Sequence, residues 1–79
     1  MVTVLKTNGL RVVIFSDDHD PAHVHVFGDG QAKINLRDTA SGPELIWAEG
    51  MTRTEVRRAM RLVLEHQTLL LARWRDMHG

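Results

Sequence analysis

The segment that decides the fold is His23-Val24-His25-Val26-Phe27-Gly28-Asp29-Gly30-Gln31-Ala32-Lys33-Ile34, residues 23–34. Histidine and valine alternate at its start, so an extended backbone sends both imidazoles to one face and both valines to the other. The glycines after this run are typical of a tight connection to a second strand. The segment therefore predicts a β-hairpin that separates a polar face from an apolar one.

Two registers are open for this hairpin. If residues 28–30 all form the loop, with the last glycine in the left-handed conformation of a bulged turn, Val24 pairs with Ile34 and His25 with Lys33. If only the last two of these residues form the turn, every pairing slips by one and the imidazoles face aliphatic side chains. We favour the three-residue loop because it gives one apolar face and leaves a polar one.

A second hairpin is predicted at the start of the chain, where residues 2–6 and 10–15 are rich in β-branched and aliphatic side chains. Asn8-Gly9 between them is the favoured pair for a two-residue turn with positive φ at both positions. This turn sets Leu5 opposite Val12.

The remaining chain indicates one more strand and a helix. Residues 44–49 form a short apolar run that follows a loop rich in Asp, Thr, Ser and Gly. Thr52 and Glu55 have capping-box spacing, and apolar side chains then recur every three or four residues. We expect a single α+β domain over residues 1–79, with an antiparallel sheet of four to five strands packed against one long C-terminal α-helix of about 25 residues.

The composition limits the classes of function. The chain has no cysteine, so disulfides and thiolate chemistry are excluded. Ten basic side chains balance ten acidic ones, which argues against binding nucleic acid by bulk charge. Residues 1–50 hold four basic and seven acidic side chains, whereas residues 51–79 hold six basic and three acidic ones, so the first part of the chain is acidic and the last part basic. No signal sequence or membrane-spanning run is evident, and we expect a cytoplasmic protein.

Three histidines and three aspartates fall within residues 16–26 and predict a site. One interpretation is a metal centre, with His23 and His25 on one strand face and His19 or Asp17 from the preceding loop. Such a set supplies the three protein ligands that a divalent transition metal needs in a catalytic site.

Two other interpretations of the same segment stay open. Two imidazoles can act as base and acid on a phosphodiester without a metal, while Lys33 or Arg11 stabilises the negative charge on phosphorus. The histidines and aspartates can also form a hydrogen-bonded network that only fixes the loop.

Four arginines crowd the start of the predicted helix, where like charges at i,i+4 cost local stability and oppose the helix dipole. They are candidates for contacts with nucleic-acid phosphate or an acidic partner, and otherwise form a solvated face. They are Arg53, Arg57, Arg58 and Arg61.

Phe15-Ser16-Asp17-Asp18-His19-Asp20-Pro21-Ala22-His23-Val24-His25-Val26, followed by Ala32-Lys33-Ile34 and a helix with Glu65-His66 and Trp74, resembles a known family. It is the small prokaryotic family of domains of unknown function numbered 4160, and the likeness spans nearly the whole chain. Ala22 stands where proline is frequent in the family.

The resemblance implies a gene context but no established reaction. Members of the family are often encoded beside another small protein, as in type II toxin–antitoxin pairs, where a compact sheet-plus-helix protein is commonly the toxin and often an RNase. Our leading hypothesis is a toxin-like component that acts on RNA through the histidines. The alternatives are a non-enzymatic binding module (an antitoxin or adaptor) and a metal-stabilised structural domain. We expect either a small antitoxin-like partner or self-association through the C-terminal helix.

Overall fold

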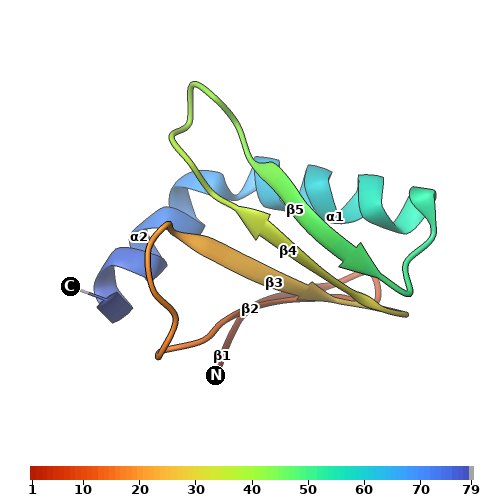
Figure 1. Cartoon of the computed structure of the whole chain (residues 1–79), viewed down its shortest axis with the longest axis horizontal. Coiled ribbons are helices and arrows are strands. Elements are labelled where there is room, and N and C mark those ends of the chain that lie inside the picture. The colour runs from red at the N-terminus through yellow and green to blue at the C-terminus, as the bar shows by residue number, and fades with distance from the viewer. Residues whose placement is uncertain (79) are drawn as a thin grey trace.

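A five-stranded antiparallel sheet carries two helices on one of its faces in the computed structural model, which describes residues 1–78 (Figure 1). The strands follow one another in the sheet in chain order, so each pairs with its sequence neighbours. This confirms the predicted α+β class. The elements are β1 (Val2–Thr7), β2 (Leu10–Ile14), β3 (His23–Phe27), β4 (Gln31–Asn35), β5 (Glu44–Glu49), α1 (Arg53–Glu65) and α2 (Gln67–His78).

The β3–β4 hairpin has the register that the three-residue loop predicts. Val24 pairs with Ile34, and His25 pairs with Lys33. The valines and Ile34 are fully buried toward the helices, while His25 and Lys33 lie on the opposite face, which we call the open face. The alternation of the sequence is thus converted into a core side and a polar side of the sheet.

The prediction of a left-handed last glycine in this loop was wrong. Gly30 does not have a positive φ. A glycine is needed there for a different reason, because a Cβ atom at Gly30 would lie 1.9 Å from the carbonyl oxygen of Glu49. The loop and the end of β5 touch backbone to backbone, and only a residue without a side chain permits this approach.

The β1–β2 hairpin turns at Asn8 and Gly9, whose φ angles of 52° and 78° confirm the predicted turn. Leu5 pairs with Val12 as expected. Farther from the turn the register shifts between Thr3 and Leu5, so Val4 is an extra residue on β1. Such a bulge is common on an edge strand, where one side of the ladder is free to bend.

The predicted single long helix is divided at His66, whose φ of −117° and ψ of 19° end α1 before α2 begins. Gln67 accounts for the break, because its buried side-chain amide donates to the carbonyl oxygens of Leu36 and Asp38. These bonds draw the chain toward the end of β4. The bend lets both helices follow the sheet and bury Leu70, Leu71 and Trp74.

The start of α1 is tied to the β3–β4 loop. Thr52 caps the helix by accepting a hydrogen bond from the Glu55 backbone N–H at 3.1 Å, as the capping-box spacing predicts. The Glu55 carboxylate accepts instead from the backbone N–H of Asp29 at 3.2 Å, so the reciprocal half of the box is replaced by a tertiary contact.

No helix within residues 1–78 has both the length and the apolar character needed to cross a lipid bilayer.

Candidate functional site

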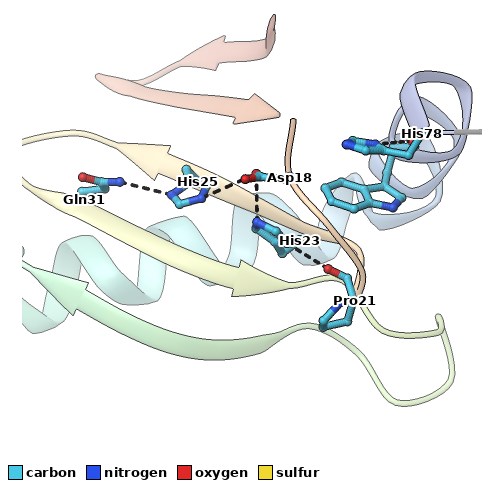
Figure 2. Close-up of polar contacts among 7 residues, drawn as sticks. Asp18, Pro21, His23, His25, Gln31 and His78 are labelled. Atoms are coloured by element: carbon cyan, nitrogen blue, oxygen red, sulfur yellow. Dashed lines mark hydrogen bonds and ion pairs between the residues drawn. The ribbon is translucent and has the colours of Figure 1, made fainter. Parts of the chain in front are cut away.

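A cluster of Asp18, His23 and His25 lies on the open face where the β2–β3 loop folds over β3. One ligand atom from each of these residues lies within 4.8 Å of the other two. Asp18 stands between the two imidazoles, with its Oδ2 atom 2.9 Å from Nε2 of His23 and 3.9 Å from Nε2 of His25 (Figure 2). The two histidines of β3 and the carboxylate of Asp18 from the β2–β3 loop therefore lie close together on the open face.

His23 is held rigidly. Its ring is buried and lies 5.0 Å from the ring of Trp74 on α2, centroid to centroid. Its Nδ1 atom donates a hydrogen bond of 2.8 Å to the carbonyl oxygen of Pro21, which can only accept. The proton of the neutral imidazole is therefore on Nδ1, and the lone pair of Nε2 faces Asp18. A ring N–H bound to a backbone carbonyl is the usual support of a metal-ligating histidine.

The Oδ2 atom of Asp18 is buried and makes no hydrogen bond of acceptable geometry, although it lies 2.9 Å from Nε2 of His23. A carboxylate oxygen and an unprotonated imidazole nitrogen at this distance repel each other, since both are acceptors. A cation between them, or a proton on Nε2, removes the repulsion. Either a protonated His23, which forms an ion pair with Asp18, or a bound cation would satisfy this pair of atoms.

His25 is partly exposed and joins the cluster to β4. The Gln31 side-chain amide donates to Nδ1 of His25 at 3.1 Å (Figure 2). This arrangement puts the ring proton on Nε2, toward Asp18. Metal binding through Nε2 requires the tautomer with its proton on Nδ1. Rotating the Gln31 amide by 180° would bring its oxygen to accept a hydrogen bond from that Nδ1–H.

The pKa of His25 is lowered from its ordinary value. The main cause is burial of the ring, followed by repulsion from His23 when that ring is protonated, and Lys33 adds a smaller lowering, while Asp18 acts in the opposite direction. The lowered pKa keeps the His25 imidazole neutral near pH 7, and the neutral ring is the form that binds a metal or accepts a proton.

The structure brings together only some of the residues that the sequence pattern selects. His23, His25 and Lys33 are neighbours, because the strand register sets Lys33 beside His25. Asp17 and His19 are exposed in the loop and lie outside the cluster, and Asp18 takes the place between the imidazoles. The role of each in binding or catalysis remains a prediction.

The predicted arginines, unlike Lys33, lie away from the cluster. Arg11 is on the open face but pairs with Phe27, and its guanidinium carbon lies 5.4 Å from the centroid of that ring. The four arginines of α1, a helix that covers the opposite face of the sheet, are exposed. Arg58 donates to the Asn8 carbonyl oxygen, and Arg57 donates to the hydroxyl of Thr54 at 3.4 Å.

Sequence reasoning missed three residues of this region. Asp18 could not be told from its neighbours, because no periodicity orients a loop. Gln31 and Trp47 could have been found from the strand register, which determines the residues that lie on the same face as His25. On this face, Lys33 of β4 pairs with Trp47 of β5. The Trp47 ring lies 6.0 Å from that of His25, centroid to centroid.

The cluster has a donor set that could hold a transition metal. Two His nitrogens and one carboxylate oxygen suit Zn²⁺ or Fe²⁺ and leave positions open for water or substrate. Ligands bound tetrahedrally at about 2.0–2.2 Å from an ion lie about 3.3–3.6 Å apart. The distances of 2.9 and 3.9 Å from Asp18 Oδ2 to the two imidazoles lie on either side of that range.

Comparison with known proteins gives a family and nothing further. No curated protein and no solved structure matches the chain. The model of a family described as a domain of unknown function, DUF4160, matches residues 9–75, which include the whole cluster and most of both helices. The chain therefore belongs to the DUF4160 family.

Proposed function

We propose that the protein is a metal-dependent hydrolase of RNA phosphodiesters and the toxin-like member of a cytoplasmic two-protein module. The observation that carries the proposal is the buried Oδ2 of Asp18, which faces the lone pair of His23 without a hydrogen bond. A divalent cation satisfies both atoms at once. A bound ion of this kind polarises a phosphoryl oxygen and lowers the pKa of a bound water.

The other residues of the open face suit the same substrate. Lys33 lies beside His25 and presents an ammonium group that can stabilise negative charge on the phosphoryl oxygens. His23 is fixed by Pro21 and Trp74, so its orientation does not have to be set when substrate binds. Asp18 and both imidazoles are partly or largely shielded from solvent, which strengthens electrostatic interactions within the cluster.

Cleavage of single-stranded RNA tests the proposal. The protein loaded with Zn²⁺ or Mn²⁺ is expected to cleave a labelled oligoribonucleotide, and the chelator-treated protein is expected to be inactive. Lys33→Gln should lower kcat about hundredfold without changing the metal content, because it removes one charge from the transition state. Arg73→Gln is the matched control, since Arg73 is an exposed cation on α2 and not on the open face of the sheet, and it should cleave at the parent rate.

Two results would contradict this assignment. Equal cleavage by the chelated protein would favour acid–base catalysis by His23 and His25 alone. Absence of cleavage under all conditions, together with a melting temperature that falls on chelation, would favour a metal-stabilised structural domain.

A small partner protein is the second part of the proposal, and the helices support it. Leu64 and Leu69 are 56% and 43% exposed, and Arg53, Arg57 and Arg61 follow one another at i,i+4 spacing on α1. Side chains at this spacing share one face of a helix. An acidic segment of a partner would relieve their mutual repulsion, and a non-enzymatic binding module would use the same surface.

Charge reversal tests this surface. Arg57→Glu combined with Arg61→Glu is expected to weaken binding to the protein encoded by the adjacent gene by a factor of ten or more. Arg73→Glu combined with Arg75→Glu makes the same change in net charge on α2 and should bind as the parent does. The measurement is co-purification followed by titration calorimetry. Equal loss in both double variants would mean that net charge, rather than the α1 face, governs association.

A further inference from the structure

A row of functional side chains crosses the open face at right angles to the strands. His25 on β3 pairs with Lys33 on β4, and Lys33 pairs with Trp47 on β5. Adjacent strands are about 4.8 Å apart, so three neighbouring positions span about 10 Å. The row begins at His25 of the Asp18–His23–His25 cluster, continues through Lys33 and ends at Trp47, whose ring extends back across the row to 6.0 Å from the His25 ring, centroid to centroid.

Trp47 is not part of the hydrophobic core. It is 36% exposed on the edge strand β5, whereas Trp74 on α2 is buried in the core. Its ring stands on the open face, 6.0 Å from the His25 ring and at 66° to it. A large aromatic side chain that is exposed beside a polar cluster offers a flat surface for another ring.

We propose that Trp47 and Lys33 form a nucleotide subsite for single-stranded RNA, with a base stacked on the Trp47 indole and its phosphate on the Lys33 ammonium. The inference rests on the proposed function and specifies its substrate class. The order of groups along the row matches a nucleotide strand, whose bases and phosphates need an aromatic face and a cation respectively. The phosphodiester beyond Lys33 would then lie at the Asp18–His23–His25 cluster.

The neighbouring row on the open face provides a second aromatic–cation pair. Arg11 pairs with Phe27, and its guanidinium lies over that ring at 5.4 Å from the centroid. Rows on one face of a sheet repeat every second residue, about 7 Å along the strand. The Arg11–Phe27 pair lies on β2 and β3 and the Lys33–Trp47 pair on β4 and β5, so the two pairs are also offset by two strands across the sheet, about 10 Å. A single strand would have to cross the open face diagonally to contact both. A duplex is excluded from such a site because its bases are stacked on each other and present no free face.

Binding of a fluorescein-labelled oligoribonucleotide of eight nucleotides tests the subsite. The experiment uses the metal-free protein with Asp18→Asn as background, so that hydrolysis does not interfere. Trp47→Ala is expected to raise Kd about tenfold or more, since loss of one base–aromatic stack has an effect of this size. Trp47→Phe keeps an aromatic face and should recover most of the affinity.

Leu45→Ala is the matched control. Leu45 is on the same strand and similarly exposed at 40%, but it pairs with Ile34 and so belongs to the helix side of the sheet. It should bind as the parent does. Lys33→Gln should reduce the slope of log Kd against log salt concentration by about 0.7, the value for one phosphate contact on a single strand.

The inference is overturned if Trp47→Ala binds as tightly as the parent, if Leu45→Ala is equally impaired, or if a duplex binds as well as the single strand. Its failure is separable from that of the proposed function. Binding that depends on Trp47, without cleavage by the metal-loaded parent, would support the subsite and contradict hydrolysis. Cleavage by the parent, with Trp47→Ala binding and cleaving RNA equally well, would support hydrolysis and contradict the subsite.

Discussion

Asp18→Asn is expected to lower the affinity of the protein for Zn²⁺ by more than about a hundredfold, because it replaces a charged ligand with a neutral amide. Changes to residues that only support ligands already cost about 10- to 100-fold. At a Zn²⁺ concentration about one hundred times Kd, binding stabilises the parent by about 2.7 kcal/mol. For a domain of this size that energy raises the melting temperature by about 10–20 °C. The variant should show almost no rise.

The apo variant separates a metal site from a structural network. Asp18 Oδ2 makes no hydrogen bond, so Asp18→Asn without metal should melt at or slightly above the parent temperature. If the carboxylate served only to pin the loop, the apo variant would melt at a lower temperature. Protein purified without a histidine tag, elemental analysis and thermal melts with and without Zn²⁺ are sufficient to measure both effects.

Asp17→Asn and His19→Ala are the matched controls, because both residues are exposed in the same loop as Asp18. They should bind Zn²⁺ with the parent affinity. Loss of binding in either control, with Asp18→Asn unaffected, would overturn the cluster and support the ligand set that the sequence pattern alone indicates.

Gly30→Ala is expected to destabilise the fold by about 3 kcal/mol or more, at the upper end of what overpacking a close-packed interior costs. The added Cβ would lie 1.9 Å from the Glu49 carbonyl oxygen and 2.4 Å from the Gly50 carbonyl carbon. Both atoms belong to the backbone, so no rotamer change relieves the contact. The β3–β4 loop and the end of β5 would have to move apart.

Gly9→Ala provides the comparison for this change. Gly9 has a positive φ of 78°, but no atom lies within 4 Å of an added Cβ. The substitution therefore carries only the left-handed backbone cost of about 1–2 kcal/mol. Urea unfolding of the two variants measures the difference, and a Gly30→Ala variant no less stable than Gly9→Ala would show that the two segments are not in close contact.

The sheet was predictable from the sequence because its turns and its strand faces are specified by residues close together in the chain. Asn8-Gly9 specifies a turn, and the alternation around His25 specifies which face each side chain takes. The helix break was not predictable, since Gln67 is a good helix former and its effect depends on carbonyl groups about 30 residues earlier in the chain.

The candidate site, like the fold, is predictable from the sequence only in part. The two strand histidines and Lys33 can be placed on one face from the sequence alone, because side chains on a strand alternate with period two. The loop residue between the imidazoles cannot, since Asp17, Asp18 and His19 are equivalent as a sequence pattern. Their positions depend on how residues 15–22 pack across β3, which no local signal encodes.

The order of strands in the sheet has a consequence for how the chain acquires its structure. Each strand pairs only with the strands before and after it in the chain. The loops that must close to form the sheet are therefore short, and short closures cost little chain entropy. Folds dominated by such sequence-local contacts reach the native state quickly. The sheet can grow hairpin by hairpin, leaving the docking of the helices as the one step that joins distant parts of the chain.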